Sequence, residues 1–349
     1  MKRKKTRKIM IGDVPVGGNS SISIQSMTNT ETKDIANTVK QIQRLEAAGC
    51  DIIRAAVTDL DDAEAIKKIK EQITIPFIAD IQYDYKLAIA AVEKGADCLR
   101  LNPGNIGSRA KVMEVVNVCK ERQIPIRIGV NSGSIKKEYL EKYKGVNEDS
   151  MVYSALEHVR ILEDLNFENI KISLKASNVP LTIKSYEKMS QKVDYPLHLG
   201  VTEAGPIWRG TVKSAVGIGA LLSMGIGDTI RISLTGDPVE EVKVGREILR
   251  SLGLLEEGIE VISCPTCGRT KIELINLVEE AEKRLEGINK PLKVAIMGCP
   301  VNGPGEAREA DIGIAGGQGE GLIFKKGKVI KKVKEEFLID ELINEIETL

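Results

Sequence analysis

The stretch that decides the fold is IANTVKQIQRLEAAGCDIIRAAV, residues 35–57. Its first half carries apolar side chains at the spacing of one helix face, at Ile35, Val39, Ile42 and Leu45. Gly49 is a helix-stop residue and is followed at once by the β-branched segment 51–57. The stretch therefore predicts a helix that leads directly into a buried strand.

Similar units recur along most of the chain. Short apolar segments separated by amphipathic stretches predict eight strands, at residues 21–28, 51–57, 75–81, 98–102, 124–130, 170–176, 196–202 and 229–235. Repeated strand–helix units imply a parallel sheet, and eight of them in about 250 residues match a closed (β/α)8 TIM barrel. An open doubly wound sheet stays possible, but the number of strands favours closure. We therefore expect an α/β protein whose barrel domain spans residues 1–252.

Polar residues at the expected C-terminal ends of the strands are candidates for substrate binding, because active sites of such barrels lie there. They are Arg54, Asp80, Arg100, Asn102, Arg127, Asn131, Lys175, Glu203 and Ser233. Several cations at one mouth would repel one another unless an anion lay between them, and guanidinium groups match phosphate oxygens. The pattern predicts a diphosphate-sized anionic substrate. The competing interpretation is that these charges form ion pairs around the rim.

Other titratable residues of the barrel have plainer interpretations. We expect His198 to pack in the barrel wall and His158 to be an ordinary residue in the middle of a helix. Cys50, Cys98 and Cys119 each stand alone in an apolar context, which is typical of a small buried hydrophobic residue.

A second domain, residues 253–349, is predicted from a change of pattern after the last barrel helix. It has the pattern of a strand, a cysteine turn, a helix, a second strand, a loop rich in Pro and Gly, further short strands and a closing helix. This order predicts an α+β domain. Its glycine-rich segment 313–321 lacks the spacing of a phosphate loop and predicts a hairpin turn.

Three cysteines and one glutamate of this domain point to a metal centre: Cys264, Cys267, Cys299 and Glu306. Structural zinc usually takes four Cys or His ligands from two close pairs, but Cys299 has no partner cysteine and the domain has no histidine. A redox pair of Cys264 and Cys267 leaves Cys299 unexplained, and purely structural thiols do not suit polar turns. An iron–sulfur cluster explains all three thiols, and a carboxylate as fourth ligand would leave one iron exchangeable.

Charge and hydropathy argue against two classes of partner. Lys plus Arg and Asp plus Glu both number 50, so no global field favours nucleic acid. No stretch approaches the roughly 18 uncharged apolar residues of a membrane span. The apolar run after the basic N-terminus is too short for a signal peptide. We expect a cytoplasmic protein with reduced thiols, no membrane association and a solvated basic terminus.

Several motifs together resemble the 4-hydroxy-3-methylbut-2-enyl diphosphate synthase family, in its compact two-domain bacterial form. They run nearly from end to end: IQSMTNT (24–30), ADIQYDY (79–85), LRLNPGN (99–105), RIGVNSGS (127–134), SLKAS (173–177), LGVTEAG (199–205), IRISLTGDP (231–238), SCPTCGRT (263–270) and MGCPVNGPGEA (297–307). The resemblance implies a TIM barrel followed by a 4Fe-4S domain like that of sulfite and nitrite reductases. It also implies a head-to-tail homodimer in which the cluster of one subunit closes over the barrel mouth of the other.

The resemblance further implies a reaction and the roles of individual residues. The reaction is the two-electron reductive opening of 2-C-methyl-D-erythritol 2,4-cyclodiphosphate in the non-mevalonate isoprenoid route, with flavodoxin or ferredoxin as electron donor. By motif match, Cys264, Cys267, Cys299 and Glu306 would hold the cluster, Glu306 yielding its place to substrate. The nine strand-end residues above would bind the cyclic diphosphate, and Glu203 is the candidate proton donor.

One position departs from the family pattern. Where members often have Ala-Asp-Ile-His-Phe, this chain has Gln82 in place of the histidine. Glutamine cannot transfer a proton at neutral pH, so acid–base catalysis at this position is excluded. The rival hypotheses are a non-redox barrel enzyme of the pterin or phosphosugar type with a structural zinc domain, and an electron carrier in which the barrel is a scaffold.

Overall fold

The computed structural model describes residues 2–299 and 309–349. The chain forms two compact units, of which the first ends at Leu254 and the second begins at Leu255. Each unit has its own sheet and its own hydrophobic core. No helix in the described part of the chain is long and apolar enough to cross a membrane.

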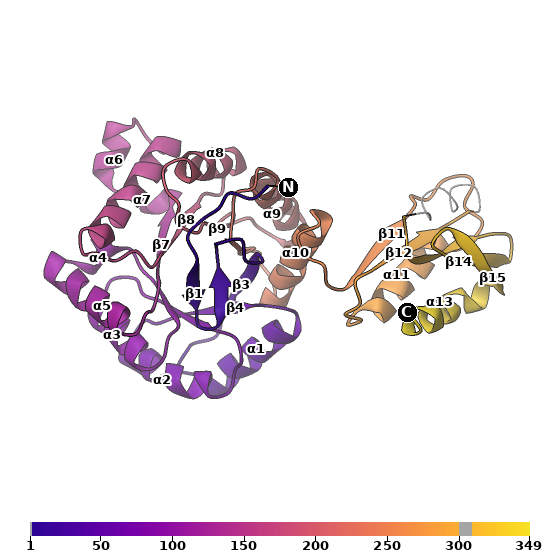
Figure 1. Cartoon of the computed structure of the whole chain (residues 1–349), viewed down its shortest axis with the longest axis horizontal. Helices are drawn as coiled ribbons and strands as arrows, with labels where there is room; N and C mark the ends of the chain where they lie inside the picture. Colours follow the sequence, from indigo (N-terminus) through magenta and orange to yellow (C-terminus); the bar gives the residue numbers. More distant parts are fainter. Residues whose placement is uncertain (1, 300–308) are drawn as a thin grey trace. The chain divides into compact units, whose positions relative to one another are not determined.

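The first unit is the predicted TIM barrel (Figure 1). Its eight strands are β3 (Ser23–Met27), β4 (Ile52–Ala56), β5 (Phe77–Asp80), β6 (Cys98–Arg100), β7 (Ile126–Asn131), β8 (Ile170–Lys175), β9 (His198–Leu199) and β10 (Thr229–Ile230). They are joined in the order β8-β7-β6-β5-β4-β3-β10-β9, and every neighbouring pair is parallel. A bridge between Ile172 and Leu197 closes the ring, so each strand predicted from the sequence is confirmed.

Helices surround the strands as an outer layer (Figure 1). They are α1 (Ile35–Ala47), α2 (Leu60–Lys70), α3 (Tyr85–Glu93), α4 (Pro103–Ile106), α5 (Arg109–Glu121), α6 (Lys137–Lys142), α7 (Glu148–Glu163), α8 (Val179–Ser190), α9 (Ile207–Ser223) and α10 (Pro238–Ser251). Helix α1 follows the predicted pattern: the Asp34 side chain caps its first turn, and Val39, Ile42 and Leu45 are buried. Gly49 then adopts φ +91°, a conformation that favours glycine and lets the chain turn into β4.

A short hairpin covers the floor of the barrel. Its strands β1 (Ile9–Ile11) and β2 (Val14–Val16) place Ile11 and Val16 against Ile52, Ile78 and Cys98. Neither three-residue strand was predicted.

The basic segment before this hairpin is only partly solvated as predicted: Lys2, Lys4, Lys5 and Lys8 are exposed, but Arg3 is half-buried and Thr6 is buried. Arg3 donates a hydrogen bond to the buried Asp228 at 3.2 Å, and Thr6 donates one to the same carboxylate at 2.9 Å. Asp228 also accepts from the backbone N–H of Leu197 at 2.9 Å. The segment is therefore tied to the strand β9 region of the barrel.

The second unit is the predicted α+β domain. Its strands are β11 (Ile259–Ser263), β12 (Leu292–Met297), β13 (Ile312–Gly316), β14 (Glu320–Lys325) and β15 (Lys328–Lys334), in sequence order across one sheet. The first three are parallel and the last three antiparallel. Helices α11 (Leu274–Leu285) and α13 (Leu338–Glu347) contribute Leu277, Ala281 and Leu342 to its core. The glycine-rich segment forms the β13–β14 hairpin, as predicted.

Candidate functional site

A cavity of about 270 Å³ opens at the C-terminal ends of the barrel strands. Eight of the nine predicted substrate-binding residues line it: Arg54, Asp80, Arg100, Asn102, Arg127, Asn131, Lys175 and Ser233. They come from strands β4, β5, β6, β7 and β8 or from the residues that follow strands β6 and β10. Parallel strands bring these side chains together because all of their C-terminal ends lie on one face of the barrel.

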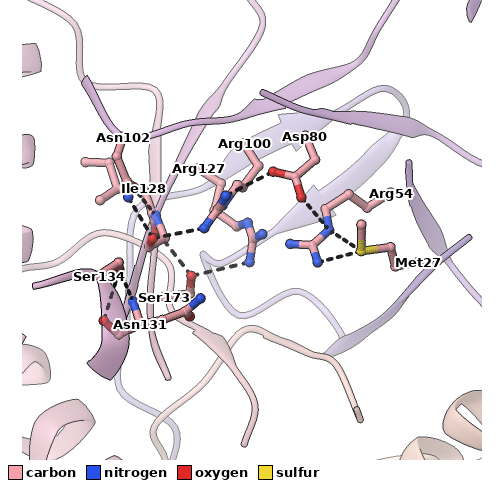
Figure 2. A network of polar contacts seen from close by, with 11 residues as sticks. Met27, Arg54, Asp80, Arg100, Asn102, Arg127, Ile128, Asn131, Ser134 and Ser173 are labelled. Carbon is pink, nitrogen blue, oxygen red and sulfur yellow. Dashed lines mark hydrogen bonds and ion pairs between the residues drawn. The ribbon is translucent and has the colours of Figure 1, made fainter. Parts of the chain in front are cut away.

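Asp80 organises two of the cations, as Figure 2 shows. Its carboxylate accepts a hydrogen bond from Arg100 at 3.1 Å, and its other oxygen lies 3.7 Å from Arg54 Nε. Burial opposes ionisation of this carboxyl group, but the guanidinium groups of Arg54, Arg100 and Arg127 outweigh burial and lower its pKa. Asp80 is therefore a fixed anion that aligns both arginines.

Gly129 on strand β7 fixes Asn102 and gives Arg100 a second partner. Asn102 donates to the Gly129 carbonyl and accepts from its N–H, both at 2.9 Å, and Arg100 donates to the same carbonyl at 3.2 Å. A Cβ at this position would lie 2.8 Å from Arg100 Nε, so any other residue would displace the guanidinium from its place over the strand. Arg127 donates to Ser173 at 3.3 Å on the neighbouring strand.

The positive charge of the cavity exceeds the negative charge. Besides Arg54, Arg100 and Arg127, the cavity contains Lys175 and Arg231, whereas Asp80 is the only carboxylate among its described lining residues. Glu241 lies nearby, 3.9 Å from Arg231.

Lys175 is the clearest case of an uncompensated charge. Its side chain is 6% exposed, and its Nζ has no hydrogen-bond partner within the described residues. Burial, followed by repulsion from Arg231, Arg127 and Arg54, lowers its pKa well below the ordinary value. Rim ion pairs therefore account for Arg54 and Arg100 but not for Lys175, and an anion in the cavity would supply the missing partner.

Arg231 was not predicted from the sequence. It directly follows strand β10 and lines the cavity together with Ser233. Residues two apart on a strand share a face, so the prediction of Ser233 already implied an inward-facing Arg231. Burial lowers the pKa of its guanidinium, and the opposing effect of Glu241 is weaker.

Glu203 is the predicted site residue that the structure does not bring into the cavity. It is exposed, has φ +51°, and follows Thr202, which does line the cavity. Its role as a proton donor stays a prediction. His198 is buried in the wall, with its Nδ1 2.7 Å from Thr229 Oγ1, and Cys50, Cys98 and Cys119 are buried, all as predicted.

In the second unit, two adjacent parallel strands carry cysteines just beyond their ends. Strands β11 and β12 pair Ser263 with Ile296, so Cys264 lies beside the segment that leads to Cys299. The N–H of Gly298 donates to Cys264 Sγ at 3.2 Å, and Cys299 is buried. Cys267 is exposed, and hydrogen bonds from Arg269 are the largest cause of its lowered pKa.

The lowered pKa of Cys267 and the N–H donor beside Cys264 Sγ suit a centre that needs sulfur ligands. Glu306 lies outside the described residues. Within residues 2–299 and 309–349, no three Cys, His, Asp or Glu side chains lie close enough together to hold a metal ion. The four-ligand set therefore stays a prediction, supported by the donor chemistry and by the hydrogen bond to Cys264.

Comparison with family models identifies both units. Residues 6–246 match the GcpE TIM-barrel domain, and residues 260–348 match the GcpE protein C-terminal domain.

Proteins similar along the whole length carry one name. A protein of Clostridium perfringens is 65% identical over 349 residues, covering 100% of both chains, and one of Clostridium acetobutylicum is 62% identical with the same coverage. One of Geobacter sulfurreducens is 59% identical over 99% of this chain and 98% of its own. Each is named 4-hydroxy-3-methylbut-2-en-1-yl diphosphate synthase (flavodoxin).

Two similar solved structures match about 70% of this chain at low sequence identity. Type I 3-dehydroquinate dehydratase from Clostridium difficile has a TM-score of 0.53 at 14% identity, covering 71% of this chain and 98% of its own. Dihydropteroate synthase from Yersinia pestis has a TM-score of 0.51 at 11% identity, covering 70% and 98%. Identities this low show the fold alone. The rival hypothesis of a non-redox barrel enzyme with a zinc domain is not supported by the full-length relatives.

Proposed function

The chain belongs to the GcpE family, and on that premise we propose that it reductively opens 2-C-methyl-D-erythritol 2,4-cyclodiphosphate to 4-hydroxy-3-methylbut-2-enyl diphosphate. The observation that carries this proposal is the surplus of buried cations at the barrel mouth. A cyclic diphosphate supplies the anionic oxygens that these side chains lack. The reaction consumes two electrons and two protons and releases one oxygen atom as water.

The barrel residues bind and orient the substrate. Arg54, Arg100, Arg127 and Lys175 hold the phosphate oxygens, and charge-assisted hydrogen bonds of this kind are the strong ones. Asp80 keeps the first two guanidinium groups in position. Asn102, Asn131 and Ser233 offer neutral hydrogen bonds, and Arg231 adds to the positive field.

Proton transfer is assigned to a separate group. Gln82 lines the cavity but cannot donate a proton at neutral pH. We assign the proton on the departing oxygen to Glu203, which the segment after β9 would bring to the mouth once substrate is bound. Because Glu203 is exposed in the structure described here, this role requires that segment to move.

We propose that Cys264, Cys267, Cys299 and Glu306 hold a 4Fe-4S cluster in the domain of residues 253–349. Bound there, the cluster would supply electrons one at a time. Cys264 is prepared for this role by the hydrogen bond from Gly298. A replaceable Glu306 would let substrate approach the cluster.

The partners follow from the same proposal. The names of the relatives point to flavodoxin as electron donor, and ferredoxin is the alternative. We propose a cytoplasmic head-to-tail homodimer in which the barrel of one chain, residues 1–252, works with the cluster of the other.

An anaerobic turnover assay tests the function. The purified protein should be brown, contain about four irons and four acid-labile sulfides per chain, and consume the cyclic diphosphate when supplied with reduced flavodoxin. Cys299→Ser should lose both colour and turnover, whereas Cys119→Ser, a buried cysteine of the barrel, should keep both. A colourless protein with stoichiometric zinc, or a brown protein that leaves the substrate intact, would overturn the proposal.

Complementation tests the shared active site. In a head-to-tail dimer, a Cys264→Ser chain and an Arg100→Ala chain are each inactive alone, but a mixed dimer has one intact barrel facing one intact cluster. Each mixed dimer formed by re-association of the two inactive variants should have one working site out of two, and so about half of the activity of a wild-type dimer. Absence of any recovery in confirmed mixed dimers would refute sharing.

A further inference from the structure

We propose that Glu157 and His158, adjacent on helix α7, are positioning residues that hold the two loops carrying Asn102, Asn105, Asn131 and Ser134 at the substrate cavity. The inference rests on the proposed function, because it takes that cavity to be the substrate site. Neither α7 residue lines the cavity, since the described lining belongs to other elements. Both residues contact the loops on the side away from the cavity lining.

His158 holds the loop after strand β6. The N–H of Gly104, in the short helix α4, donates to His158 Nδ1 at 3.1 Å. A four-residue helix satisfies few of its own N–H groups, so this acceptor replaces a missing intrahelical one. The histidine is 3% exposed. The expectation that His158 is an ordinary helical residue is therefore wrong, because its ring is the partner of a loop 54 residues away.

Gly104 shows how closely the ring and the loop approach. A Cβ on this residue would lie 2.7 Å from His158 Cε1 and 3.1 Å from Lys136 Nζ. Contacts under 3.0 Å do not occur for real Cβ atoms, so any other residue would push the loop away from α7. The glycine is required here by close packing against the imidazole.

Glu157 holds the neighbouring loop, after strand β7. Its carboxylate pairs with Lys136 at 2.6 Å, and both side chains are about one-third exposed or less. Lys136 follows the 3-10 turn Ser132–Ser134, in which the Ser134 hydroxyl accepts from the N–H of Asn131 and donates to its carbonyl, each at 3.0 Å. The ion pair thus anchors a turn whose two ends, Asn131 and Ser134, line the cavity.

The loop after strand β6 is held from the cavity side as well as by His158. Asn102 is held by the paired hydrogen bonds to Gly129, and Gly104, two residues further along, is held by its hydrogen bond to His158 on helix α7. Asn105, one residue further, lines the cavity and is exposed. Helix α7 can serve as the fixed support because a capping box of Asn147 and Ser150 starts it and its inner face is buried. Loss of either anchor frees a loop without removing a group that touches substrate.

Two histidine variants test the proposal. In His158→Asn the Oδ1 atom can replace Nδ1 as acceptor, whereas His158→Leu removes it. We expect His158→Leu to raise KM for the cyclic diphosphate about 10- to 100-fold, as small misplacements of binding groups can do, with kcat within about twofold because the reacting groups are unchanged. His158→Asn should restore KM to near the wild-type value. Ser154→Ala, a buried change on the same helix, is the control that should leave KM alone.

A double-mutant cycle tests the contact itself. Gly104→Ala should raise KM in the wild-type background but add little in His158→Ala, where the ring that it would strike is gone. Binding of inorganic pyrophosphate to each variant gives the same ranking without turnover, so failure of the proposed reaction does not hide the result. Equal KM and equal pyrophosphate affinity for wild type, His158→Leu and Gly104→Ala, or additive effects in the cycle, would overturn the inference.

Discussion

Replacing Lys175 by methionine should stabilise the protein and weaken its binding of anions. The Lys175 amine is buried, has no hydrogen-bond partner within the described residues, and is repelled in its charged form by Arg231, Arg127 and Arg54. Methionine has a similar length and no charge, so it removes the cost of burying the group while keeping the barrel filled. The absence of a side chain at Gly200 makes room for Lys175, because a Cβ on residue 200 would overlap Lys175 Nζ.

The magnitude follows from ordinary values for buried polar groups. An unsatisfied buried donor costs about 1–3 kcal/mol, so Lys175→Met should raise the free energy of unfolding by about that much. For a unit of this size, each kcal/mol corresponds to about 2–4 °C in Tm. Loss of a charge-assisted hydrogen bond worth about 1.5–3 kcal/mol should weaken pyrophosphate binding about 10- to 150-fold.

Thermal unfolding with and without pyrophosphate measures both effects in one experiment. At about 100 times the wild-type Kd, pyrophosphate should stabilise the wild type by about 2.7 kcal/mol and the variant, which binds it about 10- to 150-fold more weakly, by only about 0.3–1.4 kcal/mol. The variant should therefore melt higher without the anion, and its advantage should shrink or reverse with it. Lys184→Met, an exposed lysine on helix α8, is the matched control and should change neither quantity. A variant that melts lower without anion, or responds to pyrophosphate as the wild type does, would refute the reasoning.

Three further predictions concern the same cavity and its support. Anion binding should return the lowered pKa of Lys175 towards its ordinary value. Calorimetry in buffers of different ionisation enthalpy, repeated over a series of pH values up to the ordinary pKa of lysine, should therefore show a pH range with net proton uptake on pyrophosphate binding, and no uptake at any pH would argue against the lowered pKa. Arg231→Met should weaken pyrophosphate binding with an unchanged cluster spectrum, and an unchanged affinity would leave Arg231 with a structural role only. Burial, then repulsion by Lys136, lowers the pKa of His158 to about 4. Below about pH 6.5 the unfolded chain therefore binds more protons than the native one, and the free energy of unfolding decreases as the pH is lowered. The difference in this free energy between wild type and His158→Asn should change by about 2 kcal/mol between pH 7 and pH 5, as denaturant titrations at each pH can measure.

The barrel could be predicted from the sequence because its pattern is local. Apolar β-branched segments, helical spacing and stop residues such as Gly49 all lie within one strand–helix unit. Strand-end residues followed from the general position of active sites in this fold. The floor hairpin could not be predicted in this way. Its three-residue strands are stable only against Ile52, Ile78 and Cys98, which belong to three other units of the barrel.

Three residues have contacts or positions that the sequence analysis did not predict, and for two of them the partner lies far along the chain. Arg231 could have been predicted, because it alternates with Ser233 on one strand face. His158 could not, since nothing in its own helix indicates that its ring meets Gly104. Arg3 likewise finds Asp228 at the other end of the barrel sequence. Residue spacing within one helix or strand predicts which side chains share a face. Contacts between residues of different helices or strands can be identified only once the three-dimensional structure is known.

The cations of the barrel interior extend below the cavity, which bears on how an anion is held. Strand β8 alternates Lys171, Ser173 and Lys175 on one face; Ser173 and Lys175 line the cavity, and Lys171, the furthest of the three from the C-terminal end of the strand, is fully buried and does not line it. Burial lowers its pKa to about 7, and its Nζ has no hydrogen-bond partner in the described part of the chain. A substrate phosphate above it would favour the charged form of this amine. The barrel thus carries a cation whose charge increases as the anion enters, so binding and protonation strengthen one another at a depth that solvent cannot screen.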